Sequence, residues 1–295
     1  MEIHADVIEG PAKPASTVVM LRDCDGGGGA RLEVFLVKRH GLSDVLGGAY
    51  VFPGGKVDTQ DARLDMATHL DQTPQMLHAR LGEPALDALD AAALYVAAMR
   101  EAFEETGVLY AAGVGEPEAA RAACLLRDAL TFDEVLEEMQ LRLLAGSLVP
   151  WSRWITPLSG GVLRKRFDTR FFVATVPAGQ VAKHDNHEAT DSVWITPREA
   201  LRQYWEGAIE LAPPQIMSLA HLARHSSAQS VIADAAGTLP PLIQPEAVEQ
   251  DGVRVLCYPG DPRHPVRERA LPGPSCLHYR NRRFEPSGGF EALFD

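Results

Sequence analysis

Three glutamates near the middle of the chain, Glu101, Glu104 and Glu105, have a spacing that can bind a divalent cation. They follow an Ala-rich run at residues 86–98 with strong helix propensity, and Gly107 is a natural stop signal. Side chains at i, i+3 and i+4 share one face of a helical turn, so the three carboxylates lie together. Mg²⁺ prefers oxygen ligands of this kind and would relieve their mutual repulsion. A solvated acidic helix face is the alternative for this pattern taken alone.

A glycine loop upstream favours the metal-binding interpretation. Residues 50–58, Tyr-Val-Phe-Pro-Gly-Gly-Lys-Val-Asp, read as a short apolar strand that runs into a Pro-Gly-Gly turn. Paired glycines allow close backbone approach and positive φ, which suits a loop beside phosphate or metal. Arg100, next to the first glutamate, can pair with a carboxylate and fix its rotamer.

Together these two stretches resemble the Nudix box, G-x5-E-x7-R-E-U-x-E-E-x-G-U, in which U is aliphatic. Gly55 and Asp61 fit its first half, and residues 100–108, Arg-Glu-Ala-Phe-Glu-Glu-Thr-Gly-Val, match every fixed position of its second half. The first half departs in two ways. Asp61 stands where the family has Glu, and 38 residues separate Asp61 from Arg100 where the family has seven.

An insertion at this place is known from one branch of the family, which resembles the peroxisomal coenzyme A diphosphatases and their bacterial relatives. Two further phrases look like that branch, Trp-Ile-Thr-Pro at residues 154–157 and Arg-Phe-Asp-Thr-Arg-Phe-Phe at residues 166–172. The resemblance covers roughly residues 15–225 and leaves the rest of the chain uncovered.

The resemblance implies a metal-dependent hydrolase that cleaves a diphosphate linkage in a nucleoside diphosphate derivative, with coenzyme A or acyl-CoA as the substrate of this branch. Mg²⁺ or Mn²⁺ is the implied cofactor, with Glu101, Glu104, Glu105 and the Gly55 backbone as its ligands. The implied catalytic residues are Glu101, Glu105, Arg100 and Glu188, of which Glu101 and Glu188 are the two candidates for the general base. The alternative function is a nucleotide-sensing module without catalysis, against which the intact carboxylate trio argues.

Several cationic residues are candidate contacts for an anionic substrate. Arg39 precedes the segment that leads into the glycine loop, and Arg166 and Arg170 belong to the most basic stretch of an acidic chain. With the Gly54 and Gly55 backbone, these arginines form the expected substrate-binding set. Ordinary surface charge is the alternative for each arginine. His184 and His187 offer another base or a transition-metal site, with surface histidines as the alternative.

The resemblance also implies the fold, an α+β protein with a Nudix-type α/β/α sandwich and a mixed central sheet. Residues 1–236 are expected to form this domain, with residues 62–87 as a helical insertion inside the box. Such an insertion adds little closure entropy, because that cost grows with the logarithm of loop length, so Gly55 and Arg100 can still meet. Thr73, Pro74 and Gly82 mark a short helix within the insertion.

Residues 237–295 are rich in proline and are expected to form a C-terminal β arm, with strands at 253–258 and 276–279. This arm either closes the cleft or contacts a second subunit, which would make the protein a homodimer.

A second acidic run occurs at Asp133, Glu134, Glu137 and Glu138, directly after a capping-box threonine, Thr131. No glycine loop precedes it, so we expect an exposed helix face there.

The composition excludes some other partners. A net charge of −12 argues against nucleic acid, whose binding relies on clustered Lys and Arg. No run reaches the ~18–20 apolar residues of a membrane span. Three features predict a cytoplasmic protein. The four cysteines are scattered, the N-terminus lacks the basic start and apolar core of a signal peptide, and the last residues are not a peroxisomal address.

Overall fold

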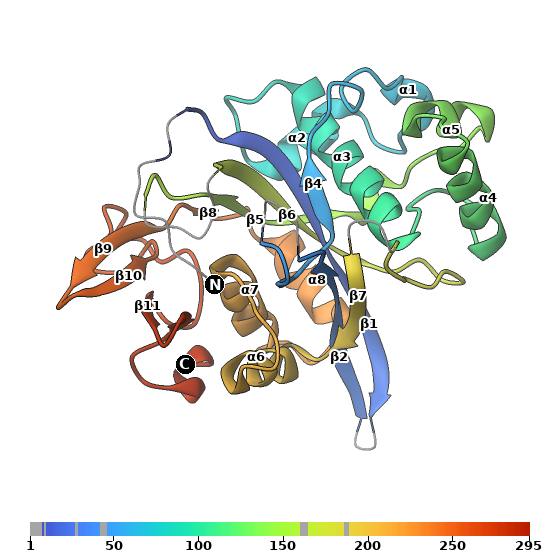
Figure 1. Ribbon diagram of the computed structural model, residues 1–295. Helices are drawn as coiled ribbons and strands as arrows, with labels where there is room; N and C mark the ends of the chain where they lie inside the picture. Colours follow the sequence, from blue (N-terminus) through green and yellow to red (C-terminus); the bar gives the residue numbers. More distant parts are fainter. Residues whose placement is uncertain (1–7, 9, 27–28, 42–45, 160–164, 186–188) are drawn as a thin grey trace.

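Apolar residues of the first strand alternate between two hydrophobic cores, and this alternation sets the architecture. The computed structural model describes residues 8, 10–26, 29–41, 46–159, 165–185 and 189–295 (Figure 1). In strand β1 (Lys13–Gly26), Val18 and Met20 pack into one core, whereas Val19 and Leu21 pack into the other. Because successive side chains of a strand point to opposite faces, a continuously apolar strand must be covered on both sides.

The central sheet is mixed, as the sequence predicts. Among the described residues it has eight strands, in the order β3-β2-β1-β6-β5-β8, with β4 beside β1 and β7 beside β2. β1 is parallel to β6 and β5 is parallel to β8, and the other pairs are antiparallel. The remaining strands are β2 (Gly29–Arg39), β3 (Tyr50–Val51), β4 (Gly54–Lys56), β5 (Val149–Ile155), β6 (Phe167–Thr175), β7 (Ala189–Ile195) and β8 (Leu242–Ile243).

The first core lies between the sheet and a layer built around the long helix α3 (Ala88–Thr106), whose Tyr95 ring lies 4.6 Å from that of Phe172 in β6. The expected helix of the insertion is present as α2 (Pro74–Leu81), capped by Thr73 and ended by Gly82 at φ +68°. The other members of this layer are α1 (Met66–His69), α4 (Glu116–Arg127), α5 (Phe132–Glu138) and the 3₁₀ turn η1 (Ala145–Ser147).

The second core lies on the other face of the sheet. It is covered by α6 (Pro197–Glu206), α7 (Pro213–Leu222) and α8 (Ala228–Gly237) (Figure 1). The two covered faces give the α/β/α sandwich expected from the sequence.

The C-terminal segment is a β arm, as predicted, and it packs on this second core. Its antiparallel sheet has the order β12-β11-β10-β9, and β8 before it extends the central sheet beside β5. Tyr258 of the arm lies edge-on to Trp154 of β5, with ring centroids 6.1 Å apart. The elements are β9 (Glu246–Gln250), β10 (Val253–Cys257), β11 (Cys276–Arg280), β12 (Arg283–Glu285) and η2 (Phe290–Leu293).

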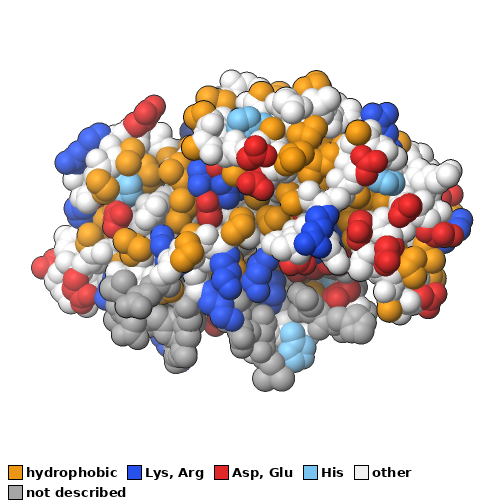
Figure 2. Space-filling view, turned by 90° about the horizontal axis from the view of Figure 1, so that it is seen from above, with side chains coloured by type: hydrophobic (Ala, Val, Ile, Leu, Met, Phe, Trp, Pro, Cys, Tyr) orange, Lys and Arg blue, Asp and Glu red, His pale blue; other side chains and the backbone are white. Residues whose placement is uncertain are grey.

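The face seen in Figure 2 carries hydrophobic side chains between scattered acidic and basic ones. Met76 of α2 and Leu89 of α3 are the large apolar residues most exposed on these two helices, at 54% each. Within the described part of the chain, no helix has the length and apolarity needed to cross a bilayer.

Candidate active site

Helix α3 carries the three glutamates near its end, with Glu101 and Glu105 directed at the glycine loop. The Asp87 side chain caps its start by accepting the Leu89 N–H at 2.8 Å, and Gly107 ends it at φ +72°, a left-handed conformation that favours glycine. Near the end of α3, Glu105 is buried, Glu101 is half-buried and Glu104 is the most exposed of the trio. The three carboxylates therefore differ in exposure, from buried to solvent-accessible, within one helical turn.

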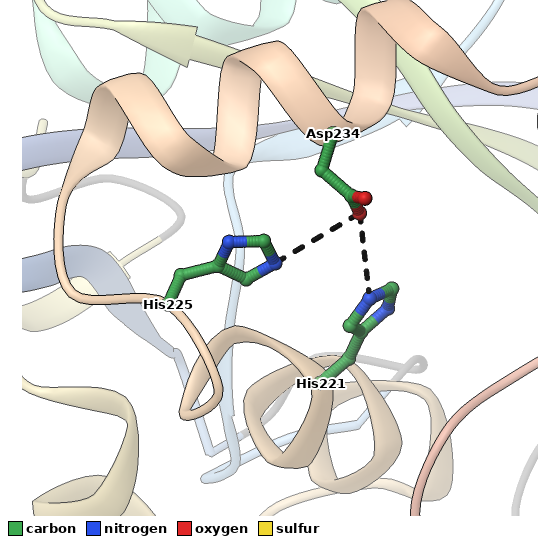
Figure 3. A group of neighbouring side chains, drawn as sticks. All are labelled: His221, His225 and Asp234. Carbon is green, nitrogen blue, oxygen red and sulfur yellow. Dashed lines mark ion pairs between the residues drawn. The ribbon is translucent and has the colours of Figure 1, made fainter.

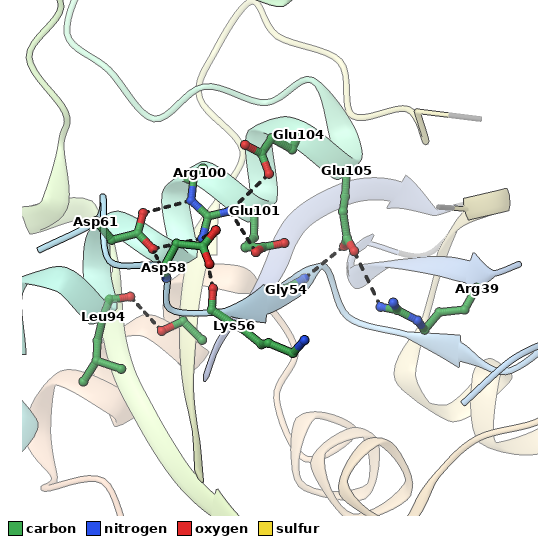
Figure 4. A network of polar contacts seen from close by, with 11 residues as sticks. Arg39, Gly54, Lys56, Asp58, Asp61, Leu94, Arg100, Glu101, Glu104 and Glu105 are labelled. Carbon is green, nitrogen blue, oxygen red and sulfur yellow. Dashed lines mark hydrogen bonds and ion pairs between the residues drawn. The ribbon is translucent and has the colours of Figure 1, made fainter. Parts of the chain in front are cut away.

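Arg100 is the centre of the polar network in Figure 4. Its Nε and Nη2 donate to both carboxylate oxygens of Asp61, at 2.8 and 2.9 Å. Nη1 donates to Glu101 at 2.9 Å and to Glu104 at 3.1 Å, and Nη2 also donates to the Lys56 carbonyl at 2.9 Å. One planar guanidinium thus fixes the rotamers of two glutamates and anchors the end of β4.

Burial by itself lowers the pKa of Arg100, but the Asp61 hydrogen bond and the neighbouring carboxylates outweigh it and raise that pKa. Burial raises the pKa of Glu104, and the charge of Arg100 opposes that rise. The guanidinium is therefore a fixed positive charge that offsets the repulsion within the trio.

Asp61, whose role the sequence left open, is the buried partner of Arg100. It is 2% exposed, and its Oδ2 also accepts the Asp58 N–H at 2.7 Å. The 38 intervening residues fold away as the helical insertion, so the two halves of the motif meet despite their separation. The shorter aspartate side chain reaches the arginine because the loop that carries it lies directly against α3.

The glycine loop touches the glutamates, as expected. The Gly54 N–H donates to Glu105 Oε2 at 3.0 Å. A Cβ at Gly55 would overlap the Glu101 carboxylate, and one at Gly54 would lie 2.7 Å from the Thr17 Cα. Side chains at either position would push the loop away from α3 or β1, so glycine is required at both for this approach.

A cavity of about 480 Å³ opens at this loop. Arg39 also lines it, and its Nη1 lies 3.6 Å from Glu105 Oε1. The polar lining is formed by Thr17, Arg39, Gly54, Gly55, Lys56, Asp58 and Glu101. The aromatic and proline lining is formed by Phe52, Trp154, Pro157, Phe167, Phe171, Pro213, Pro214 and Pro245. The cavity thus joins a charged wall to an apolar one.

The family model described as the NUDT19 Nudix domain matches residues 13–222. The chain belongs to this Nudix family. It is 29% identical over 225 residues to the acyl-coenzyme A diphosphatase NUDT19 of Xenopus laevis, covering 64% of this chain and 59% of that protein. It is 27% identical over 234 residues to the same-named protein of Gallus gallus, covering 66% and 62%. The chain thus spans about three fifths of the length of these relatives.

A solved structure, that of a Nudix hydrolase from Alicyclobacillus acidocaldarius, has the same fold. Its TM-score is 0.60 at 27% identity, and the match covers 78% of this chain and 97% of that one. The family and fold predicted from the sequence are confirmed.

The donor set at the Nudix box fits a hard divalent cation. The trio and the backbone of the glycine loop offer only oxygen atoms, which Mg²⁺ and Mn²⁺ prefer. The space that a Cβ at Gly55 would fill lies directly beside the Glu101 carboxylate. Glu104, 39% exposed, keeps part of its carboxylate accessible from solvent.

Arg170 departs from the expectation that it contacts substrate. Its Nε and Nη2 donate to both carboxylate oxygens of Glu83, at 2.9 and 2.6 Å, and its Nη1 lies 3.0 Å from Asp168. The residues of β6 that line the cavity are Phe167, Thr169 and Phe171. Strand alternation puts Arg170 on the opposite face, where it ties the insertion to the sheet.

The other expected residues have mixed placements. Arg166 lies beside the cavity, and its Nε donates to the carbonyl of cavity-lining Thr156 at 3.3 Å. His184 Nδ1 lies 2.9 Å from Ser192 Oγ. Glu188 and His187 lie outside the described residues, so the proposed roles of both stay predictions.

Sequence reasoning missed Lys56, an exposed cation in the cavity wall. The position of Lys56 directly after the two glycines could have indicated this role, because a lysine on a phosphate-binding loop brings positive charge to the ligand. It also missed Leu256 and Pro245 of the β arm, for which no local signal exists.

Proposed function

We propose that this Nudix protein is a metal-dependent diphosphatase that hydrolyses coenzyme A or acyl-CoA to 3′,5′-ADP and a phosphopantetheine product. The observation that carries the proposal is the Arg100 network at the wall of a cavity whose other wall is aromatic. The polar wall suits a diphosphate, and the apolar wall suits a pantetheine arm or acyl chain. The names of the two vertebrate relatives support this substrate class.

Glu101, Glu104, Glu105 and the Gly55 backbone would hold Mg²⁺ or Mn²⁺. A divalent ion bound there would neutralise charge on the diphosphate and favour ionisation of a bound water. The all-oxygen donor set of the site supports this choice, because both ions prefer oxygen ligands.

The residues of the chain divide the remaining work. Arg100 holds Glu101 and Glu104 in fixed rotamers, and the Gly54 N–H holds Glu105. Arg39 and Lys56 bring positive charge to the cavity wall, where they attract an anionic substrate.

The proton of the attacking water goes to a carboxylate. Glu101 lines the cavity and is one candidate, and Glu188 is the other. Kinetics of Glu101→Gln and Glu188→Gln separate them. Loss of the base removes the fall of kcat at acidic pH, where that carboxylate would be protonated, whereas loss of a metal ligand weakens the affinity for Mn²⁺.

A hydrolysis screen tests the proposal. The 295-residue chain is incubated with Mg²⁺ and CoA, acyl-CoAs, NADH, ADP-ribose or dinucleoside polyphosphates, and the products are separated by chromatography. We expect the highest kcat/KM with CoA or an acyl-CoA, and a fall of at least about 100-fold in Glu105→Gln. Glu138→Gln on α5 is the matched control and keeps wild-type turnover. Equal turnover by Glu105→Gln would contradict the catalytic role.

Two further expectations remain predictions. A cytoplasmic location accords with four free cysteines, the usual state in a reducing compartment, and cell fractionation tests it. A homodimer is tested by the mass of the protein in sedimentation equilibrium.

A further inference from the structure

A group of two histidines and an aspartate lies on the opposite face of the sheet from the Nudix box (Figure 3). His221 is in the last turn of α7, His225 lies three residues beyond that helix, and Asp234 is in α8. Their ligand atoms lie within 4.8 Å of one another, and this is the one such group of three among the described residues. The turn that follows α7 brings the two imidazole rings together, with their centroids 5.9 Å apart.

The hydrogen bonds of His225 direct a ring nitrogen at Asp234. Its Nδ1 lies 3.1 Å from the Ser230 hydroxyl, which itself donates to the Ser227 carbonyl at 2.8 Å. Because that hydroxyl proton is used, Ser230 accepts and Nδ1 carries the donated proton. Nε2 then faces Asp234 Oδ2 at 3.9 Å. A histidine whose Nδ1–H is held by a neighbour, with Nε2 directed at other ligands, has the usual arrangement of a metal-binding imidazole.

His221 supplies a second imidazole from the other side. Its Nε2 lies 3.8 Å from Asp234 Oδ2, and its ring packs on that of Trp151 with centroids 5.1 Å apart. The His221 side chain is only 19% exposed, so most of this imidazole is enclosed between Trp151 and Asp234.

No lysine or arginine pairs with the Asp234 carboxylate in the described part of the chain. Arg224, between the two histidines in sequence, is directed elsewhere and donates to the Phe294 and Asp295 carbonyls at 3.3 and 3.4 Å. The carboxylate of Asp234 therefore faces two imidazole nitrogens and lacks a fixed cationic partner among the described residues.

We propose that His221, His225 and Asp234 bind a divalent transition ion of the zinc class, which links α7 to α8. Two imidazoles and one carboxylate favour such an ion over Mg²⁺, which prefers oxygen. Zinc bonds to nitrogen and oxygen of about 2.0–2.2 Å place two tetrahedral ligand atoms roughly 3.4 Å apart. The observed nitrogen–oxygen separations are 3.8 and 3.9 Å, and all three ligand atoms lie within 4.8 Å of one another, so an ion would draw the three side chains closer together. Asp234, 49% exposed, leaves the fourth position open to water.

The site has a structural consequence for the cavity. The residues that begin α7, Pro213, Pro214 and Gln215, line that cavity, whereas His221 lies at the other end of the helix. The ion would fasten this far end to α8, which packs on β5 and β6. It would act as a brace for one wall of the cavity without entering it.

Zinc binding to the 295-residue chain tests the proposal. Metal is first removed with a chelator, and the protein then competes with a chromogenic chelator for Zn²⁺. The background variant is Glu104→Gln plus Glu105→Gln, which removes the Nudix-box carboxylates. We expect this variant to bind one equivalent of Zn²⁺ tightly. Adding His225→Gln or Asp234→Asn should weaken the affinity by more than the roughly 10–100-fold that a supporting residue costs.

Two controls keep the result interpretable. His78→Gln alters a histidine of α2, outside the group, and should leave the affinity unchanged. Melting temperatures measured without metal show whether each variant folds. Zn²⁺ should raise the melting temperature of the background variant but not that of its His225→Gln derivative. The visible absorption of bound Co²⁺ reports nitrogen and oxygen ligands directly. Absence of Zn²⁺ binding by the background variant, or equal affinity in the His225→Gln derivative, would overturn the proposal.

Discussion

Helices α3 and α5 carry similar acidic runs and lie in the same layer, where the ring centroids of Phe103 and Phe132 are 6.2 Å apart. The surroundings of the two acidic runs nevertheless differ. On α3, Glu105 is buried against a glycine loop and Arg100 holds its neighbours. On α5, Glu134 caps the helix start by accepting the Thr131 N–H at 2.8 Å, and the other two glutamates are exposed. The spacing of acidic residues alone therefore does not predict a metal site. The glycine-loop backbone and the Arg100 guanidinium that face α3 make the difference.

The largest expected difference between the two helices is in metal-dependent catalysis. Glu104→Gln plus Glu105→Gln should lower hydrolysis by at least about 100-fold, because it removes charge from the cation site. The same exchange at Glu137 and Glu138 should leave hydrolysis unchanged. Mn²⁺ should raise the melting temperature of the wild type and of the α5 variant only. A comparable loss of activity in both variants would remove the distinction.

The second difference is the buried anchor of Arg100, which α5 lacks among the described residues. Asp61→Asn leaves that guanidinium without its bidentate partner, and breaking a buried ion pair costs about 3–5 kcal/mol of unfolding free energy. Asp58→Asn is the matched control, because Asp58 is 67% exposed and lies 3.8 Å from the arginine. Urea unfolding measures both. Equal stability of the two variants would show that the anchor contributes nothing.

The third difference is the close approach of the glycine loop. Gly55→Ala places a methyl group where the Glu101 carboxylate lies, so the metal ligand must move. We expect a loss of about 10–100-fold in metal affinity, similar to that for a disturbed supporting residue. Gly237→Ala, at the end of α8 with open space around it, is the control and keeps full affinity. Calorimetric titration with Mn²⁺ gives the answer, and an unchanged affinity in Gly55→Ala would argue against the contact.

The smallest expected effect is at the start of α5. Thr131→Ala removes the hydroxyl that donates to Glu134 at 3.0 Å at the start of that helix and should cost about 1 kcal/mol of unfolding free energy. Hydrolysis should not change, because no residue of α5 lines the cavity in the described structure. A fall in kcat would mean that the second acidic run communicates with the active site after all.

The sequence predicted features whose causes are local. Thr73, Gly82, Gly107 and Thr131 mark helix ends correctly, because capping depends on a few neighbouring residues. The Nudix box was also predictable, since its second half is continuous and the cost of the insertion grows only slowly with length.

The misses have long-range causes. The sequence predicted the strand that holds Arg170, but the face to which this side chain points depends on pairing with β1 and β5, which composition does not reveal. The same holds for the β arm. Its proline-rich composition predicted strands, whereas the contact of Leu256 with the cavity depends on docking.

The arm has a consequence for how relatives of this protein diverge. The family match ends at residue 222, whereas Pro245 and Leu256, both beyond it, form part of the cavity wall. Substitutions at these two positions would reshape the cavity without touching the Arg100 network. The space offered to a ligand can therefore vary independently of the residues proposed to hold the metal.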